Sequence, residues 1–130
     1  GGKIDTSSVA IGRDSSAYSQ GVALGYSAKS NSMGGTALGS NTRTEIFATA
    51  IGCDAKATAR NAIQLGSALT YIGGHTNSDA NTFKVGNANG NFEMMDANGN
   101  VPLDRLTYVT DQIGDISAVL DSINGETLEG

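Results

Sequence analysis

The sequence is poor in the residues from which catalytic and metal sites are usually assembled. Its 130 residues include no tryptophan, one proline, one cysteine and one histidine, and aromatic residues make up only 5% of the chain. Because Cys53 is the single cysteine, an internal disulfide bond and a metal site of several cysteines are excluded. His75 stands alone in a polar stretch, so a catalytic triad based on histidine is not assembled within one chain. The sequence therefore predicts a protein that is not an enzyme and that holds no metal or cofactor.

The sequence also lacks long runs of basic residues and long runs of apolar residues. The formal net charge of −5 is spread along the chain without a run of Lys and Arg, which argues against nucleic acid and anionic membranes as partners. No apolar stretch approaches the ~18–20 residues that span a bilayer, and no signal peptide is visible. We therefore expect no insertion into a membrane. The opening Gly1-Gly2 looks like the start of a fragment or of a processed chain.

Glycine is abundant instead, with 18 copies, and five of them close the same four-residue phrase. These glycines fall at positions 12, 25, 39, 52 and 66, so the steps between them are 13, 14, 13 and 14 residues. A period this regular indicates a small structural unit stacked on copies of itself. The five phrases are Val9-Ala10-Ile11-Gly12, Val22-Ala23-Leu24-Gly25, Thr36-Ala37-Leu38-Gly39, Thr49-Ala50-Ile51-Gly52 and Ile63-Gln64-Leu65-Gly66.

Within each repeat, larger and smaller side chains alternate along the chain. The alternation predicts one short strand before each glycine and a second after it, with turns at glycine and small polar residues. Repeats of 13 or 14 residues leave no room for a helix beside two strands. Stacked units of this kind form parallel β-coils about 4.8 Å apart. The residues assigned to the core of the roll or of its trimer are Val9, Ile11, Val22, Leu24, Leu38, Ile51, Ile63 and Leu65.

The composition of the repeats indicates that one chain needs a neighbour. Ala, Ser, Thr and Gly dominate them, and these residues bury little apolar surface. The alanine face of each strand would let another backbone approach closely. We therefore expect an oligomer.

The regular period lapses after Gly66. Residues 67–81 are rich in Gly, Ser, Thr and Asn, which predicts a loop. Asn89-Gly90 and Asn98-Gly99 are strong signals for two-residue hairpin turns. Residues 82–101 are therefore predicted to form a small three-stranded β-meander.

The last segment has a heptad period. Apolar residues occupy positions a and d over three heptads, and Leu or Ile at a with Ile at d favours three or four strands over two. Pro102 suits the first turn of the helix, Gly114 weakens it by about 1 kcal/mol, and Asn124-Gly125 suits its C-terminal cap. The seam residues are Leu106, Val109, Ile113, Ile116, Leu120 and Ile123. The predicted domains are a head of five repeats at 1–66, a loop and meander neck at 67–101, and a short coiled-coil helix with its tail at 102–130.

The repeat carries a family likeness. The phrase Ser8-Val9-Ala10-Ile11-Gly12, recurring about every 14 residues over residues 8–66, resembles the head repeat of trimeric autotransporter adhesins, the YadA-like heads. The resemblance implies a mostly β fold: a trimeric, left-handed parallel β-roll of three chains packed side by side. It also implies a neck that leads from this roll into a trimeric coiled coil.

The second half resembles the C-terminal part of phage fibre and virion appendage proteins. The likeness covers residues 61–66, 77–86, 92–95 and 98–106, where a link of the form Asp-x-Asn-Gly-x-x-Pro leads into a short helix. It implies a structural homotrimeric fibre or spike at the surface of a phage virion, placed in its head, collar or tail. The partners would be two further copies, other virion proteins at one end, and a host-surface glycan or protein. The alternative is the head fragment of a bacterial trimeric autotransporter-like adhesin at the cell surface.

Three basic residues share one position in the repeat. Lys29, Arg43 and Lys56 each lie four residues after a repeat glycine, where the first coil has Ser16. In a stacked roll they form a column with steps of about 4.8 Å. One interpretation is a solvated ridge that keeps the roll soluble and blunts strand pairing. The other is a binding site for anionic glycans on a cell surface.

The remaining candidates for chemistry favour structural explanations. The stretch 96–100 resembles a calcium loop, but its glycine is fourth rather than sixth, so a hairpin turn is favoured. A metal site formed by three copies of His75 around a threefold axis remains an alternative. Cys53 fits a position in a turn. The remote alternative, a glycan-cleaving spike, requires paired carboxylates about 5–10 Å apart. The acidic residues of the repeat region do not align at one register: Asp5, Asp14, Glu45 and Asp54.

Overall fold

A computed structural model of the chain describes residues 3–4, 7–67, 74–105 and 107–129. The chain divides into two compact units, Gly1–Asn100 and Val101–Gly130. The segments predicted as head and neck thus belong to one unit, and the helical segment forms the other.

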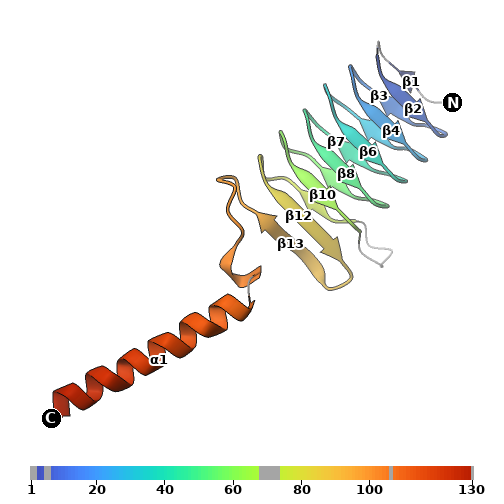
Figure 1. Cartoon of the computed structure of the whole chain (residues 1–130). Helices are drawn as coiled ribbons and strands as arrows, with labels where there is room; N and C mark the ends of the chain where they lie inside the picture. Colours follow the sequence, from blue (N-terminus) through green and yellow to red (C-terminus); the bar gives the residue numbers. More distant parts are fainter. Residues whose placement is uncertain (1–2, 5–6, 68–73, 106, 130) are drawn as a thin grey trace. The chain divides into compact units, whose positions relative to one another are not determined.

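The first unit consists of two sheets of short strands (Figure 1). Six two-residue strands form one sheet, in the order β1 (Lys3–Ile4), β3 (Ser16–Ala17), β5 (Lys29–Ser30), β7 (Arg43–Thr44), β9 (Lys56–Ala57) and β11 (Thr76–Asn77). The seven-stranded sheet has the order β13 (Gly90–Met95), β12 (Phe83–Asn87), β10 (Ile63–Leu65), β8 (Thr49–Ile51), β6 (Thr36–Leu38), β4 (Val22–Leu24) and β2 (Val9–Ile11).

The chain passes from one sheet to the other and back in each repeat, and so builds a β-solenoid (Figure 1). Equivalent residues of successive repeats lie side by side in parallel strands. Val22, for example, lies between Val9 and Thr36, and Ala37 pairs with Ala50 of the following coil. The prediction of two strands per repeat, stacked in parallel, is confirmed.

The repeat glycines are required by the turn that connects the two sheets. Gly25 has a φ of 133°, and a Cβ atom on it would lie 2.7 Å from the carbonyl carbon of Gly39 in the next coil. Two residues after such a glycine the backbone is left-handed, with φ values of 59° at Asp14 and 57° at Asn41. Any side chain at Gly25 would therefore force adjacent coils apart, which explains why glycine recurs once per repeat.

Small side chains fill the interior of the solenoid. Ala23, Ala37 and Ala50 of the seven-stranded sheet are fully buried, and they face Thr44 and Ala57 of the six-stranded sheet, which are equally buried. Two sheets joined by such short turns lie close together, which favours small side chains between them. The interior is therefore densely packed but contributes little apolar surface.

The larger apolar residues of the seven-stranded sheet point away from this interior, because side chains alternate along a strand. Ile11 is 64% exposed, and Ile51 is 40% exposed. Their assignment to the core of the roll is therefore wrong for the single chain, whose core is alanine. Their part in a trimer contact stays a prediction. The residues concerned are Val9, Ile11, Val22, Leu24, Leu38, Ile51, Ile63 and Leu65.

The predicted meander differs from the structure in two ways. Strand β12 stacks in parallel on β10, with Phe83 beside Ile63 and Val85 beside Leu65, so it belongs to a further coil of the solenoid. Strand β13 pairs with it in antiparallel fashion, and no third strand follows among the described residues up to 105. The Asn98-Gly99 turn instead closes a loop in which the Asp96 amide donates to the Asn100 carbonyl.

Polar side chains close the C-terminal end of the solenoid. Gln64, fully buried at the alanine position of β10, exchanges hydrogen bonds of 2.8 and 2.9 Å with the side-chain amide of Asn91. Asn77 is also fully buried and donates to the carbonyls of Ile63 and Thr82. Each amide finds its partners within the chain, so these buried polar groups cost little.

The second unit contains a short 3₁₀ turn, η1 (Leu103–Arg105), and one helix, α1 (Thr107–Glu129). The Arg105 amide donates to the Pro102 carbonyl, so Pro102 begins this separate turn and not, as the sequence had predicted, the first turn of the helix. The predicted cap at Asn124-Gly125 is wrong, because α1 continues to Glu129. A glycine inside a helix costs only about 1 kcal/mol relative to alanine, which four further helical residues tolerate.

Candidate interaction surfaces

The outer face of the seven-stranded sheet is apolar along the whole stack. Two columns of side chains cross it, one at the first and one at the third residue of each strand. Thr36 and Thr49 are the two polar members. We call this surface the apolar face, formed by Val9, Ile11, Val22, Leu24, Leu38, Ile51, Ile63, Leu65, Phe83 and Val85.

The dimensions of the apolar face follow from its strands. Six strands from β2 to β12 span five steps, about 24 Å, and each contributes two outward side chains about 7 Å apart. A continuous exposed apolar strip of this kind marks an interaction surface on a soluble protein. The sequence predicted the two columns of larger apolar side chains. It did not show that smaller residues would fill the interior and leave these columns outside.

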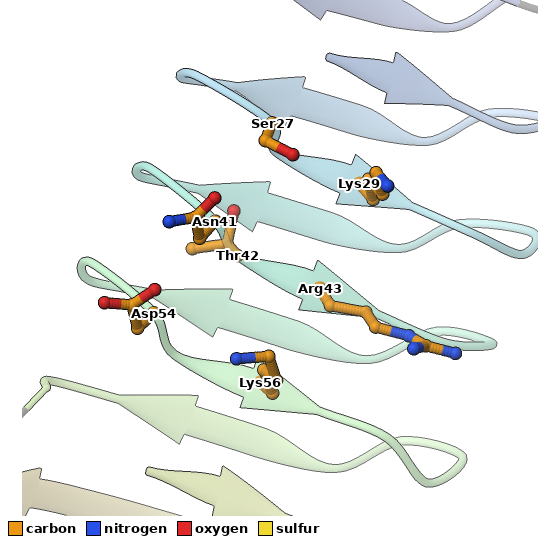
Figure 2. A pocket seen from close by; sticks show the side chains of 7 residues that line it. All are labelled: Ser27, Lys29, Asn41, Thr42, Arg43, Asp54 and Lys56. Atoms are coloured by element: carbon orange, nitrogen blue, oxygen red, sulfur yellow. The ribbon is translucent and has the colours of Figure 1, made fainter. Parts of the chain in front are cut away.

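The outer face of the six-stranded sheet carries the predicted basic residues. Lys29 lies between Ser16 and Arg43, and Arg43 lies between Lys29 and Lys56. Their alignment in one column is therefore confirmed, and we call these three residues the basic column. A depression of about 320 Å³ lies along it (Figure 2). Its lining residues are Ser27, Lys29, Asn41, Thr42, Arg43, Asp54 and Lys56.

One acidic residue, Glu45, forms an ion pair with Arg43, the middle residue of the basic column. Glu45 Oε1 lies 3.3 Å from Arg43 Nη2, and the Glu45 carboxylate also accepts hydrogen bonds from Ser32 Oγ at 2.8 Å and from Asn31. Burial alone would raise the pKa of Glu45, but these hydrogen bonds and the Arg43 charge lower it below its usual value. Glu45 therefore stays ionised, and it holds Arg43 toward the turn.

Helix α1 exposes a second apolar strip. Ile113, Ile116 and Leu120 are between 51% and 67% exposed, and Val119 beside them is 59% exposed although the heptad pattern did not include it. A shallow depression of about 350 Å³ is lined by Asp115, Ile116, Val119, Leu120 and Ile123. Of the other predicted seam residues, Leu106 and the side chain of Val109 lie outside the described part of the chain.

The residues considered for catalysis or metal binding have structural surroundings. His75 Nε2 lies 2.8 Å from the Asn87 carbonyl oxygen, and its ring occupies the space where a side chain on Gly86 would lie. Cys53 is exposed in a turn, and partial burial together with the Asp54 charge raises the pKa of its thiol. Among the described residues, no group of three or more His, Cys, Asp or Glu could hold a metal ion.

Two of the acidic residues do share a register, contrary to the expectation from sequence. Asp14 and Asp54 occupy the same left-handed turn position, three coils apart, which is about 14 Å. Paired carboxylates for glycoside hydrolysis are about 5–10 Å apart. Asp5 lies outside the described residues. In the loop at 96–100, Asp96 Oδ1 accepts hydrogen bonds from the amides of Asn98 and Asn100 at 2.9 Å, as in a turn.

Comparison with known protein families finds a match within the repeats. Residues 19–42, from the turn before β4 to the turn before β7, match the family model of the YadA head domain repeat in two copies. No curated protein and no solved structure matches the chain. No helix in the described ranges combines the length and the apolar character needed to cross a bilayer. The β-solenoid and the family match together support a YadA-like head.

Proposed function

We propose that this chain is the head of a homotrimeric, adhesin-like fibre displayed on a surface. The observation that carries the proposal is the apolar face: it lies outside an alanine-filled solenoid whose repeats match the YadA head repeat. Three copies, packed around one axis through these faces, would remove the largest apolar surface of the roll from water. The function of such a fibre is to extend from the surface as a stiff rod and to attach through several copies of the same binding site.

The energetic argument starts from what a single chain cannot bury. Its fully buried apolar residues are alanines, while Val9, Ile11 and Ile51 are between 40% and 64% exposed. Burial of such side chains contributes about 25 cal/mol per Å². Because the strip is straight and continuous, it fits the same strip on another copy, and a closed ring of copies leaves none exposed. The same proposal includes a left-handed solenoid.

Helix α1 supports the same number of copies. Leu or Ile at position a with Ile at position d favours trimers or tetramers. Its exposed Ile113, Ile116 and Leu120 would be covered in a coiled coil of three strands. The two units therefore point independently to one assembly.

The family match favours a bacterial cell surface as the location of this trimer. The virion alternative rests on the likeness of segments between residues 61 and 106 to phage fibre proteins. The genes beside this one distinguish the two: a capsid or tail gene supports the virion, whereas a membrane anchor encoded downstream supports the cell-surface adhesin.

The direct test is the mass of residues 1–130 in solution, measured by light scattering. We expect three times the chain mass of 13.2 kDa. A monomer at micromolar concentration would contradict the proposal, because the apolar face would then be stable in water. A dimer would contradict it as well, since a closed threefold ring would not exist.

A further inference from the structure

We propose that the basic column and the depression beside it bind an acidic polysaccharide that lies along the stacking axis of the solenoid. The proposal names the ligand class for the attachment function and rests on that function for its biological meaning. The site is made by consecutive coils rather than by a single loop (Figure 2).

The spacing of the cations fits a linear polymer. Lys29, Arg43 and Lys56 pair across neighbouring parallel strands, so each coil presents one positive charge. The steps of about 4.8 Å are close to the advance of one sugar residue in an extended polysaccharide. A chain with one carboxylate or sulfate per sugar, or per second sugar, would therefore meet the cations in register.

The charges of the basic column are only partly balanced by the protein. Arg43 has Glu45 as its partner, whereas neither Lys29 nor Lys56 forms an ion pair within 4.0 Å in the described part of the chain. Like charges on adjacent strands repel one another. A polyanion along the column would relieve this repulsion, because it supplies negative charges opposite the cations.

The turn beside the basic column offers polar groups at the same spacing. Ser27, Asn41 and Asp54 occupy the left-handed turn position of three successive coils and line the depression (Figure 2). The side chains of Ser27 and Asn41 form no hydrogen bond with the described residues. Together with the Asp54 carboxylate they provide donors and acceptors for sugar hydroxyl groups, which a purely ionic site would lack.

The location of the site is compatible with the trimer. The basic column lies on the six-stranded sheet, and the apolar face lies on the outer surface of the other sheet. Contacts through the apolar face therefore leave the column open to solvent. Three parallel columns on one rigid rod would bind a polymer with avidity that exceeds the affinity of one site.

Nucleic acid is the less favoured polyanion. The chain has a net charge of −5, and the depression contains no aromatic side chain on which a base could stack. Hydroxyl, amide and carboxylate groups beside the cations fit sugars better than bases. We therefore commit to a polysaccharide and make duplex DNA a competing outcome of the test.

The experiment measures binding of the full chain to three immobilised polysaccharides: a polyuronate, a heparin-type sulfated polymer and neutral dextran. We expect binding to at least one of the two acidic polymers, none to dextran, and a loss of binding as salt is raised. The two acidic polymers distinguish a carboxylate ligand from a sulfate ligand. The variant Lys29→Gln/Lys56→Gln should bind about tenfold more weakly, since each exposed ionic contact contributes a few-fold.

The matched control is Arg60→Gln/Arg105→Gln, which removes the same number of charges from residues that are not part of the basic column and should bind like the parent chain. Three results would overturn the proposal: no binding to either acidic polymer, equal losses in both double variants, or tighter binding to duplex DNA than to the polysaccharides. Light scattering on the same samples separates the two hypotheses. A trimer that binds neither polymer refutes the ligand and leaves the proposed fibre intact.

Discussion

At the residue scale, the solenoid depends on interior side chains that are small and have hydrogen-bond partners. Ser15 and Thr42 donate from their hydroxyl groups to the carbonyls of Gly12 and Gly39, at 2.7 and 2.8 Å. Thr44 Oγ1 is the exception: among the described residues it is the buried side-chain polar atom that has no partner. A buried hydroxyl without a hydrogen bond costs about 1–3 kcal/mol.

We therefore predict that Thr44→Val stabilises the protein by about 1 kcal/mol, because valine keeps the shape and removes the unsatisfied oxygen. The control is Thr42→Val, which removes a hydroxyl that does have a partner and should destabilise the protein by about the same amount. Chemical denaturation at one fixed protein concentration measures both. If both variants lose stability equally, Thr44 Oγ1 has a hydrogen-bond partner that the structure does not show.

At the element scale, short strands were predictable from sequence because glycine and the alternation repeat at each coil. The sixth coil was missed. Its phrase, Phe83-Lys84-Val85-Gly86, comes 20 residues after the start of the preceding one and has lysine in place of alanine. Lys84 reaches Asp79 at 2.6 Å, which satisfies its charge at the end of the stack. The pairing of Gln64 with Asn91, 27 residues away, likewise had no local signal.

For helix α1, the sequence predicted exposed apolar residues but not the end of the helix. Its heptad pattern predicted the exposed strip at Ile113 and Ile116, but the end of the helix was misplaced at Asn124-Gly125. A helix of 23 residues with an exposed apolar strip depends on burial of that strip for much of its stability. Its stability is therefore expected to depend on association.

We predict that Ile116→Asp unfolds α1 and weakens the trimer, because three carboxylates would be placed together on one axis. Ala118→Asp introduces the same charge off the seam and should leave helicity and mass unchanged. Circular dichroism and light scattering of the two variants provide the comparison. Equal helicity and equal mass in both would show that the strip on α1 does not form a coiled coil.

At the scale of the whole molecule, the outer faces of the two sheets differ in polarity and charge. One outer face is apolar over six strands, while the other carries the basic column and small polar residues. The sequence contained both columns, but it could not tell which side of each strand would be interior. That choice follows from the short turns, which hold the two sheets close together and so favour alanine and other small side chains inside.

This division predicts different effects for equal substitutions on the two faces. Ile51→Asp places a charge on the apolar face, where the side chain is 40% exposed in one chain but would be buried in a trimer. The single solenoid should keep its strands, while the trimer should dissociate at micromolar concentration, because three unpaired carboxylates would be buried near one axis. Thr76→Asp puts the same charge on the exposed outer face of the other sheet and should remain trimeric. Light scattering gives the mass of each variant, and circular dichroism gives its strand content. If Ile51→Asp remained a trimer as stable as the parent chain, the apolar face would not be the contact between copies, and the proposed assembly would have to use another surface.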